Sequence, residues 1–276
     1  MKIFLTGGSG FIGKNFINEA LQNNFEIYAI TRDKFIANNE KRAGINWIYG
    51  DLTQKYEKYY KKCDIFVHIA AYGVVDSSPK FNEYFNWNVE QPIKMAESAI
   101  ECGIKKFLVI GSCSEYGLSA NKYKFIPEDA ALIPVDNYGL SKSIATIKFQ
   151  VLAMKFNLKL SILRLFHVFG EGENNKRLWM SLKIAASNGK DCHVTKGEQV
   201  RDFSHVSFVV KKMINYCSFE SVICGQPVIK NIGSGNVLSV KEFSNYWWKK
   251  FNASGKIYYD LPYRKDEIMR IVPKLN

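Results

Sequence analysis

Zinc-type cysteine patterns and long apolar segments are both missing from this sequence. Its six cysteines include no Cys-x-x-Cys pair and show no zinc-like spacing with the four histidines, so we expect no metal site. No apolar run approaches the ~20 residues that cross a bilayer, and the apolar start stops at Gly7, far short of a signal peptide. We therefore expect a cytoplasmic protein with reduced thiols and no membrane partner.

A basic tract is also absent, although the chain is basic overall. Lysine and arginine number 38 against 26 aspartates and glutamates, for a formal net charge of +12. These basic residues are scattered in ones and twos, and no DNA- or RNA-binding motif accompanies them. We expect no nucleic-acid partner and interpret the charge as a solvated surface whose positive potential favours an anionic small molecule.

Short apolar runs alternate with helical patterns over the first 165 residues, and the alternation loosens afterwards. It predicts an α/β fold with a doubly wound parallel sheet of the Rossmann type. We expect a dinucleotide-binding domain over residues 1–165 and a smaller, mainly substrate-binding domain over 166–276, with about 200–232 returning to the first domain. The predicted strands are Lys2–Thr6, Phe25–Thr31, Asn46–Tyr49, Asp64–Ala70, Lys106–Ile110 and Lys159–Leu165, and the longest predicted helices cover 81–102 and 138–156.

Three glycines at intervals of three residues follow the first predicted strand, and a helical pattern follows them. Strand, glycine turn and helix is the context of a dinucleotide-binding fingerprint. The glycines permit a tight turn and close contact of the backbone with a pyrophosphate, while the helix N-terminus offers unpaired N–H groups to the phosphates. We expect a dinucleotide at Gly7, Gly10, Phe11, Ile12 and Gly13.

Tyr138 and Lys142 are spaced as Tyr-x-x-x-Lys in a helical segment, so both side chains project from one face. A free tyrosine has a pKa of about 10, and a neighbouring ammonium group lowers it by favouring the phenolate. Ser112 follows the fifth predicted strand at the same sheet edge, where its hydroxyl would hydrogen-bond a carbonyl oxygen that Tyr138 protonates. We predict that Ser112, Tyr138 and Lys142 are catalytic.

Motifs of one family recur along essentially the whole chain. They are Thr6-Gly-Gly-Ser-Gly-Phe-Ile-Gly13, Gly111-Ser112-Cys-Ser-Glu-Tyr-Gly117, Tyr138-Gly-Leu-Ser-Lys142, Leu163-Arg-Leu-Phe-His-Val-Phe-Gly170, Arg201-Asp-Phe-Ser-His-Val206, Asn231-Ile-Gly-Ser-Gly235 and Tyr263-Arg264…Glu267. With these motifs the chain resembles the extended short-chain dehydrogenases/reductases, in the NAD-dependent epimerase/dehydratase group that acts on nucleotide sugars.

The resemblance implies roles for further residues. His167 stands where the family usually has asparagine, so a substrate-phosphate contact and a packed structural histidine are both open there. Lys142 and Tyr138 would also contact the cofactor, with Lys142 on the nicotinamide ribose. The remaining cofactor residues would be Asp51 and Leu52 near the adenine, Ala70 and Ala71 at the cofactor's middle, and Asn88; the remaining substrate residues would be Ser114, Arg201, Arg264 and Glu267.

The end of the second strand bears on which cofactor is used. NAD-binding relatives place an acid there for the adenine ribose, whereas this chain has Thr31 followed by Arg32. A guanidinium pairs with a 2′-phosphate, and no carboxylate repels it, so these residues favour NADP over NAD. Asp33 would take the acid's role if the strand ended two residues later.

The residues after Ser112 bear on the reaction. The family's dehydratases place Asp-Glu there, and this chain has Cys113 and Ser114 instead. The resemblance therefore favours a reductase that uses NADPH to reduce the 4-keto group of a dTDP-, CDP- or GDP-linked 4-keto-6-deoxyhexose for bacterial surface polysaccharides such as O antigen. An NAD-retaining 4-epimerase of the UDP-glucose/UDP-galactose type and a nucleotide-sensing regulator are the alternatives, and related enzymes suggest a possible homodimer.

Overall fold

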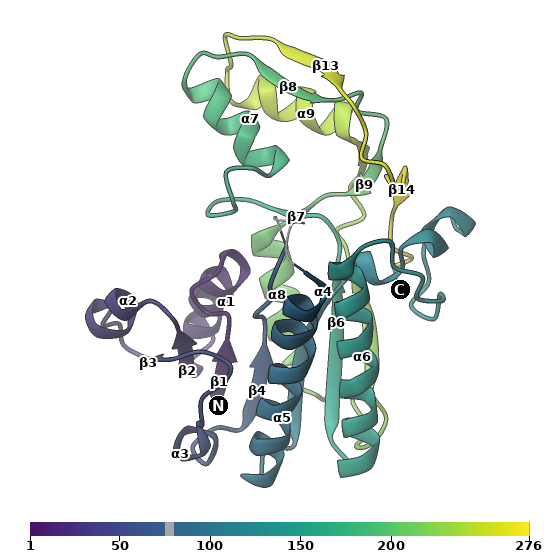
Figure 1. Cartoon of the computed structure of the whole chain (residues 1–276). Coiled ribbons are helices and arrows are strands. Elements are labelled where there is room, and N and C mark those ends of the chain that lie inside the picture. The colour runs from purple at the N-terminus through teal and green to yellow at the C-terminus, as the bar shows by residue number, and fades with distance from the viewer. Residues whose placement is uncertain (75–79, 276) are drawn as a thin grey trace.

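A seven-stranded sheet forms the centre of the protein, whose computed structural model describes residues 1–74 and 80–275 (Figure 1). All strand pairs in this sheet are parallel, in the order β11-β6-β5-β4-β1-β2-β3. The Rossmann-type α/β fold is confirmed. The strands are β1 (Lys2–Thr6), β2 (Glu26–Thr31), β3 (Ile45–Tyr49), β4 (Ile65–His68), β5 (Lys106–Ser112), β6 (Lys159–Leu165) and β11 (Val228–Ile232).

Helices cover both faces of the sheet because its strands are apolar on both sides. One face packs against α1 (Phe11–Gln22) and α8 (Val206–Tyr216), and the other against α3 (Glu57–Tyr60), α5 (Gln91–Glu101) and α6 (Asn137–Phe156). The short helix α2 (Lys34–Asn39) contacts the edge strand β3. Full burial of a phenylalanine such as Phe16 or Phe149 stabilises the fold by about 1.5–3 kcal/mol, so each face contributes substantially.

The helix expected over 81–102 consists of three successive segments. These are α4 (Phe81–Phe85), a π-helical stretch η1 (Asn86–Glu90), and α5. Pro92 lies near the start of α5, where it has no N–H to donate and its ring would clash with the carbonyl group four residues earlier, at Asn88. We attribute the widened turn to this proline. Its consequence is that Asn88 is 2% exposed and faces the site.

A smaller lobe lies beyond the carboxyl ends of the sheet strands (Figure 1). Its aromatic core joins Trp179 and Phe243, whose helices α7 (Leu178–Ser187) and α9 (Val240–Lys250) pack on each other. Two strands distant in sequence, β8 (Cys192–Thr195) and β13 (Ile257–Leu261), pair in parallel along the outer side.

Short strands connect the lobe to the sheet, and the chain between them returns to the sheet as α8 and β11. The division into domains at residue 165 stays a prediction. The connecting strands are β7 (Val168–Phe169), paired with β10 (Ser204–His205), and β9 (Val200–Asp202), which lies between β12 (Val237–Ser239) and β14 (Arg270–Ile271).

Candidate active site

Two positions of the turn after β1 leave no room for a side chain. Gly7 has φ +76°, and a Cβ atom there would lie 2.5 Å from the Ala70 nitrogen. A Cβ at Gly13 would lie 2.0 Å from the Gly7 oxygen, because α1 begins directly against the turn. Gly10 is the N-cap of α1 and provides no side-chain cap, so the first N–H groups of the helix, at Phe11, Ile12 and Gly13, can bind an anionic ligand. This geometry suits the pyrophosphate of a dinucleotide.

The end of β2 presents a cation and a carboxylate that caps a helix through one of its oxygens, Oδ1. Thr31 is 3% exposed at the end of the strand, and Arg32 beside it is exposed. The Asp33 carboxylate accepts hydrogen bonds from the N–H groups of Phe35 at 2.8 Å and Ile36 at 3.2 Å. Asp33 is thus the N-cap of α2, because β2 ends at Thr31 and not two residues later. The acid considered as an alternative ribose acceptor already stabilises a helix.

The loop after β3 carries the residues expected near the adenine. The Asp51 carboxylate accepts hydrogen bonds from the Thr53 N–H at 2.8 Å and the Thr53 hydroxyl at 2.6 Å. The Tyr56 hydroxyl donates to the Asp51 carbonyl at 2.7 Å. These bonds hold the loop in one shape, with Leu52 half-buried beside it.

Ala70 and Ala71 follow β4, next to the glycine turn. The Ala70 N–H donates to the Thr6 hydroxyl at 3.4 Å, and that hydroxyl lies 2.7 Å from His68 Nδ1. His68 is 1% exposed, and burial lowers its pKa to about 3, as expected of a neutral core histidine.

Asn88 connects the loop after β4 to α6. Its Oδ1 accepts from the Tyr72 N–H at 2.7 Å, and its Nδ2 donates to the Tyr72 carbonyl at 3.1 Å and to the Ser141 hydroxyl at 2.9 Å. Ser141 lies on α6, between Tyr138 and Lys142. Asn88 therefore fixes the loop at Tyr72 relative to the start of α6.

Ser112, Tyr138 and Lys142 come together where β5 ends and α6 begins. The Ser112 hydroxyl hydrogen-bonds Tyr138 and lowers the pKa of its phenol, but burial has the larger effect and raises this pKa. Lys142 Nζ donates to the Ile110 carbonyl at 2.5 Å, and burial lowers the pKa of Lys142. The expectation that Lys142 lowers the pKa of Tyr138 differs from this arrangement, in which the ammonium lies against the main chain of β5.

The sequence analysis missed Glu115, which is completely buried beside these residues. Its carboxylate accepts from the Ser112 N–H at 2.8 Å, the Thr146 hydroxyl at 2.9 Å and Arg164 Nε at 2.8 Å. A Cβ at Gly111 would come within 2.6 Å of this carboxylate, so glycine is needed there. The Ser-x-x-Glu spacing of a capping box was the available signal.

Ser114 lies in the same turn. Its N–H donates to the Ser112 hydroxyl at 3.1 Å, and its carbonyl oxygen would lie 2.5 Å from a Cβ at Gly139. Gly139 lies between Tyr138 and Lys142 in the chain, so its lack of a side chain lets α6 pack tightly on the Ser112 turn.

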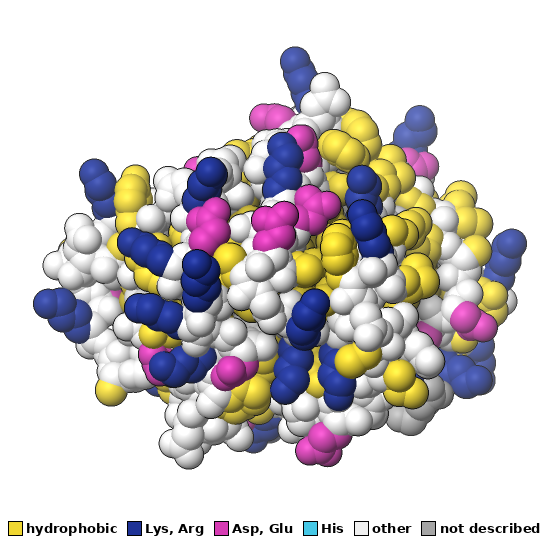
Figure 2. Space-filling view, turned by 90° about the horizontal axis from the view of Figure 1, so that it is seen from below, with side chains coloured by type: hydrophobic (Ala, Val, Ile, Leu, Met, Phe, Trp, Pro, Cys, Tyr) yellow, Lys and Arg dark blue, Asp and Glu magenta, His cyan; other side chains and the backbone are white. Residues whose placement is uncertain are grey.

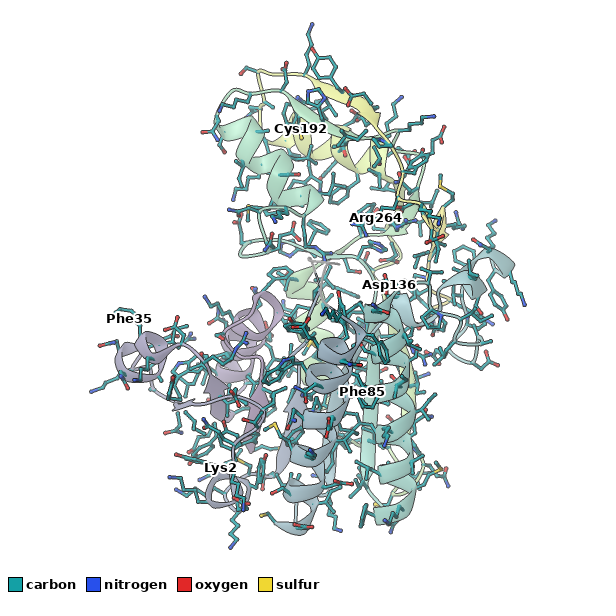
Figure 3. The ribbon with its side chains drawn as sticks, in the orientation of Figure 1. Lys2, Phe35, Phe85, Asp136, Cys192 and Arg264 are labelled. Atoms are coloured by element: carbon teal, nitrogen blue, oxygen red, sulfur yellow. The ribbon has the colours of Figure 1, made fainter. Side chains whose placement is uncertain are left out.

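The predicted substrate residues of the smaller lobe form a second group. Arg201 is 5% exposed and donates a hydrogen bond to the Glu267 carboxylate at 2.6 Å. Burial lowers the pKa of Arg201, and repulsion from the like charge of Arg264 lowers it further. Figure 3 shows Arg264 and Asp136 on opposite sides of the boundary between the lobe and the start of α6. The charge of Arg201 also acts on Cys113, next to Ser112, so a guanidinium of the lobe lies near the Ser112 turn, which suits an anionic ligand.

His167 lies between the two groups with an unsatisfied polar atom. Its buried Nδ1 has no hydrogen-bond partner among the described residues. Burial, together with the charges of Arg201 and Arg177, lowers the pKa of His167 well below its usual range. The ring lies edge-on to Phe203 at 6.1 Å between centroids. A neutral ring whose buried Nδ1 lacks a partner among the described residues is unusual in a folded protein.

Arg177 is a second residue that the sequence analysis missed. Its charge acts on both Tyr138 and His167, and its Nε lies 3.5 Å from the Glu173 carboxylate. Glu173 is 4% exposed, accepts from the Met180 N–H at 3.1 Å, and has a pKa raised by burial to about 7. No local motif marks this pair.

No group of three or more His, Cys, Asp or Glu side chains suited to a metal occurs within residues 1–74 and 80–275. In the same part of the chain, no helix has the length and hydropathy needed to cross a membrane. Figure 2 shows Lys and Arg side chains spread over the lower face, with carboxylates between them. The charge is dispersed, as in the sequence.

Comparisons with known proteins agree with this geometry. A family model described as "NAD dependent epimerase/dehydratase family" matches residues 3–221. A putative UDP-glucose 4-epimerase of Methanocaldococcus jannaschii is 26% identical over 98% of this chain and 88% of its own. A dTDP-4-dehydro-6-deoxyglucose reductase of Escherichia coli is 26% identical over 94% of this chain and 85% of its own. The structure of MoeE5 in complex with UDP-glucuronic acid and NAD has a TM-score of 0.84 at 25% identity, covering 100% of this chain and 90% of that one.

Proposed function

The chain belongs to the NAD dependent epimerase/dehydratase family, and we propose that it is an NADPH-dependent reductase of a nucleotide-linked 4-keto-6-deoxyhexose. The observation that carries the proposal is the convergence of Ser112, Tyr138 and Lys142 beside the glycine turn. Cys113 and Ser114 support a reductase over a dehydratase, since neither side chain supplies the paired acid and base of an elimination. Similarity to the E. coli reductase over 94% of this chain supports the same choice.

The charges at the end of β2 support NADP as the cofactor. Arg32 is exposed where a 2′-phosphate would lie, and Asp33 is engaged as a helix cap. Lys34 adds a second cation, with its Nζ 5.5 Å from the centroid of the Tyr49 ring. We propose that Thr31 and Arg32 bind the adenosine phosphate, with Asp51 and Leu52 at the adenine and Ala70, Ala71 and Asn88 along the middle of the cofactor.

The bound dinucleotide would supply the hydride for the sugar's C4 carbonyl carbon. Tyr138 donates its phenolic proton to the carbonyl oxygen, and the raised pKa of this tyrosine keeps the proton in place until the oxygen becomes basic. Ser112 orients that oxygen through its hydroxyl. Lys142, whose ammonium lies against the Ile110 carbonyl, would hold the nicotinamide ribose.

The substrate's diphosphate and ribose would bind to Arg201, Arg264 and Glu267, with Ser114 near the sugar. His167 Nδ1 would gain its missing hydrogen bond by donating to, or accepting from, the substrate. We favour this contact over a purely packed role because a buried nitrogen without a partner is costly. Residues 166–276, apart from the returning segment, would then form the substrate-binding domain.

The test is substitution of Tyr138 by phenylalanine, which removes the proton donor but keeps the ring. Tyr138→Phe should abolish consumption of NADPH with a panel of dTDP-, CDP- and GDP-linked 4-keto-6-deoxy sugars while NADPH binding stays within a few-fold of wild type. Unchanged turnover in this variant would refute the proposed chemistry.

A 4-epimerase that retains NAD is the second candidate. It is favoured by the similarity to the M. jannaschii protein and by the NAD in the MoeE5 complex. Purified protein that carries bound NAD and interconverts UDP-glucose and UDP-galactose without added cofactor would establish it. Protein that binds a dinucleotide but catalyses neither reaction would instead favour a nucleotide-sensing regulator that has lost the chemistry.

We also propose a cytoplasmic homodimer. Four apolar side chains on one side of α6 are exposed, and contact with a second copy would bury them. They are Leu140 (38%), Ile147 (53%), Val151 (51%) and Met154 (58%).

A further inference from the structure

A buried carboxylate touches or acts on every predicted catalytic residue. Glu115 Oε1 fixes the main chain of Ser112 at 2.8 Å, and its charge acts on both Lys142 and Tyr138. We propose that Glu115 is a positioning residue that sets the protonation of the Tyr138–Lys142 pair and the orientation of Ser112. The inference rests on the proposed role of these three residues.

The positioning part follows from three directional contacts. Glu115 is bonded to β5 through the Ser112 N–H, to α6 through the Thr146 hydroxyl, and to β6 through Arg164 Nε. These elements carry Ser112, Tyr138 with Lys142, and the start of the lobe, respectively. One carboxylate therefore joins the parts that must stay aligned for proton transfer, where a misplacement of about 1 Å costs up to ~100-fold in rate.

The electrostatic part follows from burial and from the sign of the charge. Glu115, Lys142 and Arg164 are 0%, 3% and 2% exposed, so little water screens their interactions. Burial disfavours the Lys142 ammonium, and the Glu115 charge opposes that effect. The same charge raises the pKa of Tyr138 and so favours its protonated form. A negative group here thus keeps the protons on the pair.

Arg164 compensates the buried charge of Glu115. Its Nη1 also donates to the Tyr116 hydroxyl and to the Glu128 carbonyl, each at 2.9 Å. The Tyr116 hydroxyl in turn donates a hydrogen bond at 2.6 Å to Oδ1 of Asn231, which lies on β11. These bonds to the sheet fix the position of the Glu115 carboxylate. A residue that aligns a proton donor must itself be held in place in this way.

The test is Glu115→Gln, which keeps the shape and removes the charge. We expect kcat at neutral pH to fall at least about tenfold, with the alkaline limb of the pH profile for ketone reduction moving down by roughly 0.5–1 unit. The sign follows because loss of the negative charge lowers the pKa of Tyr138 and of Lys142, and reduction needs both protonated. A lost structural contact alone would lower kcat without moving the limb.

Glu128→Gln is the matched control. It removes a carboxylate that pairs with Lys230 at 3.0 Å and not with the predicted catalytic residues. The alkaline limb of the pH profile of this variant should therefore stay at the wild-type pH. If Glu115→Gln does not fold, Glu115→Gln/Arg164→Gln removes both buried charges and should shift the limb in the same direction.

A readout independent of turnover separates this inference from the proposed reaction. The tyrosinate absorbance of Tyr138, taken as the difference from Tyr138→Phe in the complex with oxidised cofactor, should titrate at lower pH with Glu115→Gln. An unshifted titration would overturn the role of Glu115 whatever the substrate. A shifted titration in an enzyme inactive on 4-keto sugars would uphold that role while refuting the reductase.

Discussion

Replacement of Gly13 by alanine tests how tightly α1 packs on the glycine turn. The added Cβ would lie 2.0 Å from the Gly7 oxygen and 2.8 Å from both the Gly7 carbonyl carbon and the Gly8 Cα. All three neighbours are backbone atoms, so no side chain can rotate away. The turn or the start of α1 must therefore shift by about 1.4 Å or more to reach an ordinary contact of at least 3.4 Å.

The magnitude follows from this overlap. Overpacking a close-packed site costs about 1–3 kcal/mol, and each kcal/mol lowers Tm by about 2–4 °C in a chain of this size class. We expect Gly13→Ala to lower Tm by roughly 2–12 °C. Misalignment of one N–H group with a phosphate, worth about 1.5–3 kcal/mol, should weaken dinucleotide binding by about 10- to 100-fold.

Gly10→Ala is the control within the same turn. Gly10 has φ −80° and ψ 175°, which any residue adopts, and its added Cβ meets the Gly7 oxygen at 3.4 Å. Its Tm should stay within about 1 °C of wild type. Calorimetry and fluorescence titration with NADPH measure both quantities. A Gly13→Ala protein that melts and binds like wild type would refute the packing argument.

Three further predictions concern cofactor, pH and assembly. Arg32→Glu should weaken NADPH binding by about 10- to 100-fold and leave NADH binding within about threefold, by titration with each cofactor; equal losses for both would contradict a 2′-phosphate contact. The pKa of His68 is about 3 in the folded protein and about 6.5 in the unfolded chain. As the pH falls, the unfolded chain therefore binds this proton first. The free energy of unfolding then falls below pH ~6.5 by up to about 1.4 kcal/mol per pH unit. In urea unfolding of His68→Gln at several pH values, the free energy of unfolding should change less with pH by that amount. An unchanged pH dependence would contradict the prediction. Ile147→Glu/Val151→Glu should convert a dimer into a monomer in light scattering, whereas a wild-type monomer would exclude this interface.

Local patterns explain how much of the fold could be predicted. The strand Lys159–Leu165 and the turn at Gly7–Gly13 lie where the sequence placed them, because continuous apolar runs and glycine spacing act within a few residues. The predicted helix over 81–102 is helical without a break from Phe81 to Glu101, but its middle is a π-helical segment that precedes Pro92. The strand predicted as Asp64–Ala70 is shorter, since β4 ends at His68.

Long-range contacts explain what could not be predicted. β11 pairs with β6 across more than 60 residues, and β13 pairs with β8 in the lobe across a similar separation. Neither pairing has a local signal, because a strand's partner depends on how the intervening chain packs. The position of Lys142 against the Ile110 carbonyl likewise depends on how α6 lies on β5.

The sequence alone determined the residues on which the proposed chemistry depends: a glycine turn that would bind a dinucleotide, a Tyr-x-x-x-Lys pair with a serine, and a cation after the second strand. Those features depend on residue type and on spacing within a few turns of chain. Only the tertiary structure decided that Glu115 meets Arg164 and that Arg201 meets Glu267. These pairs are 49 and 66 residues apart, and burying such charges is favourable only where the fold brings their partners within hydrogen-bond distance.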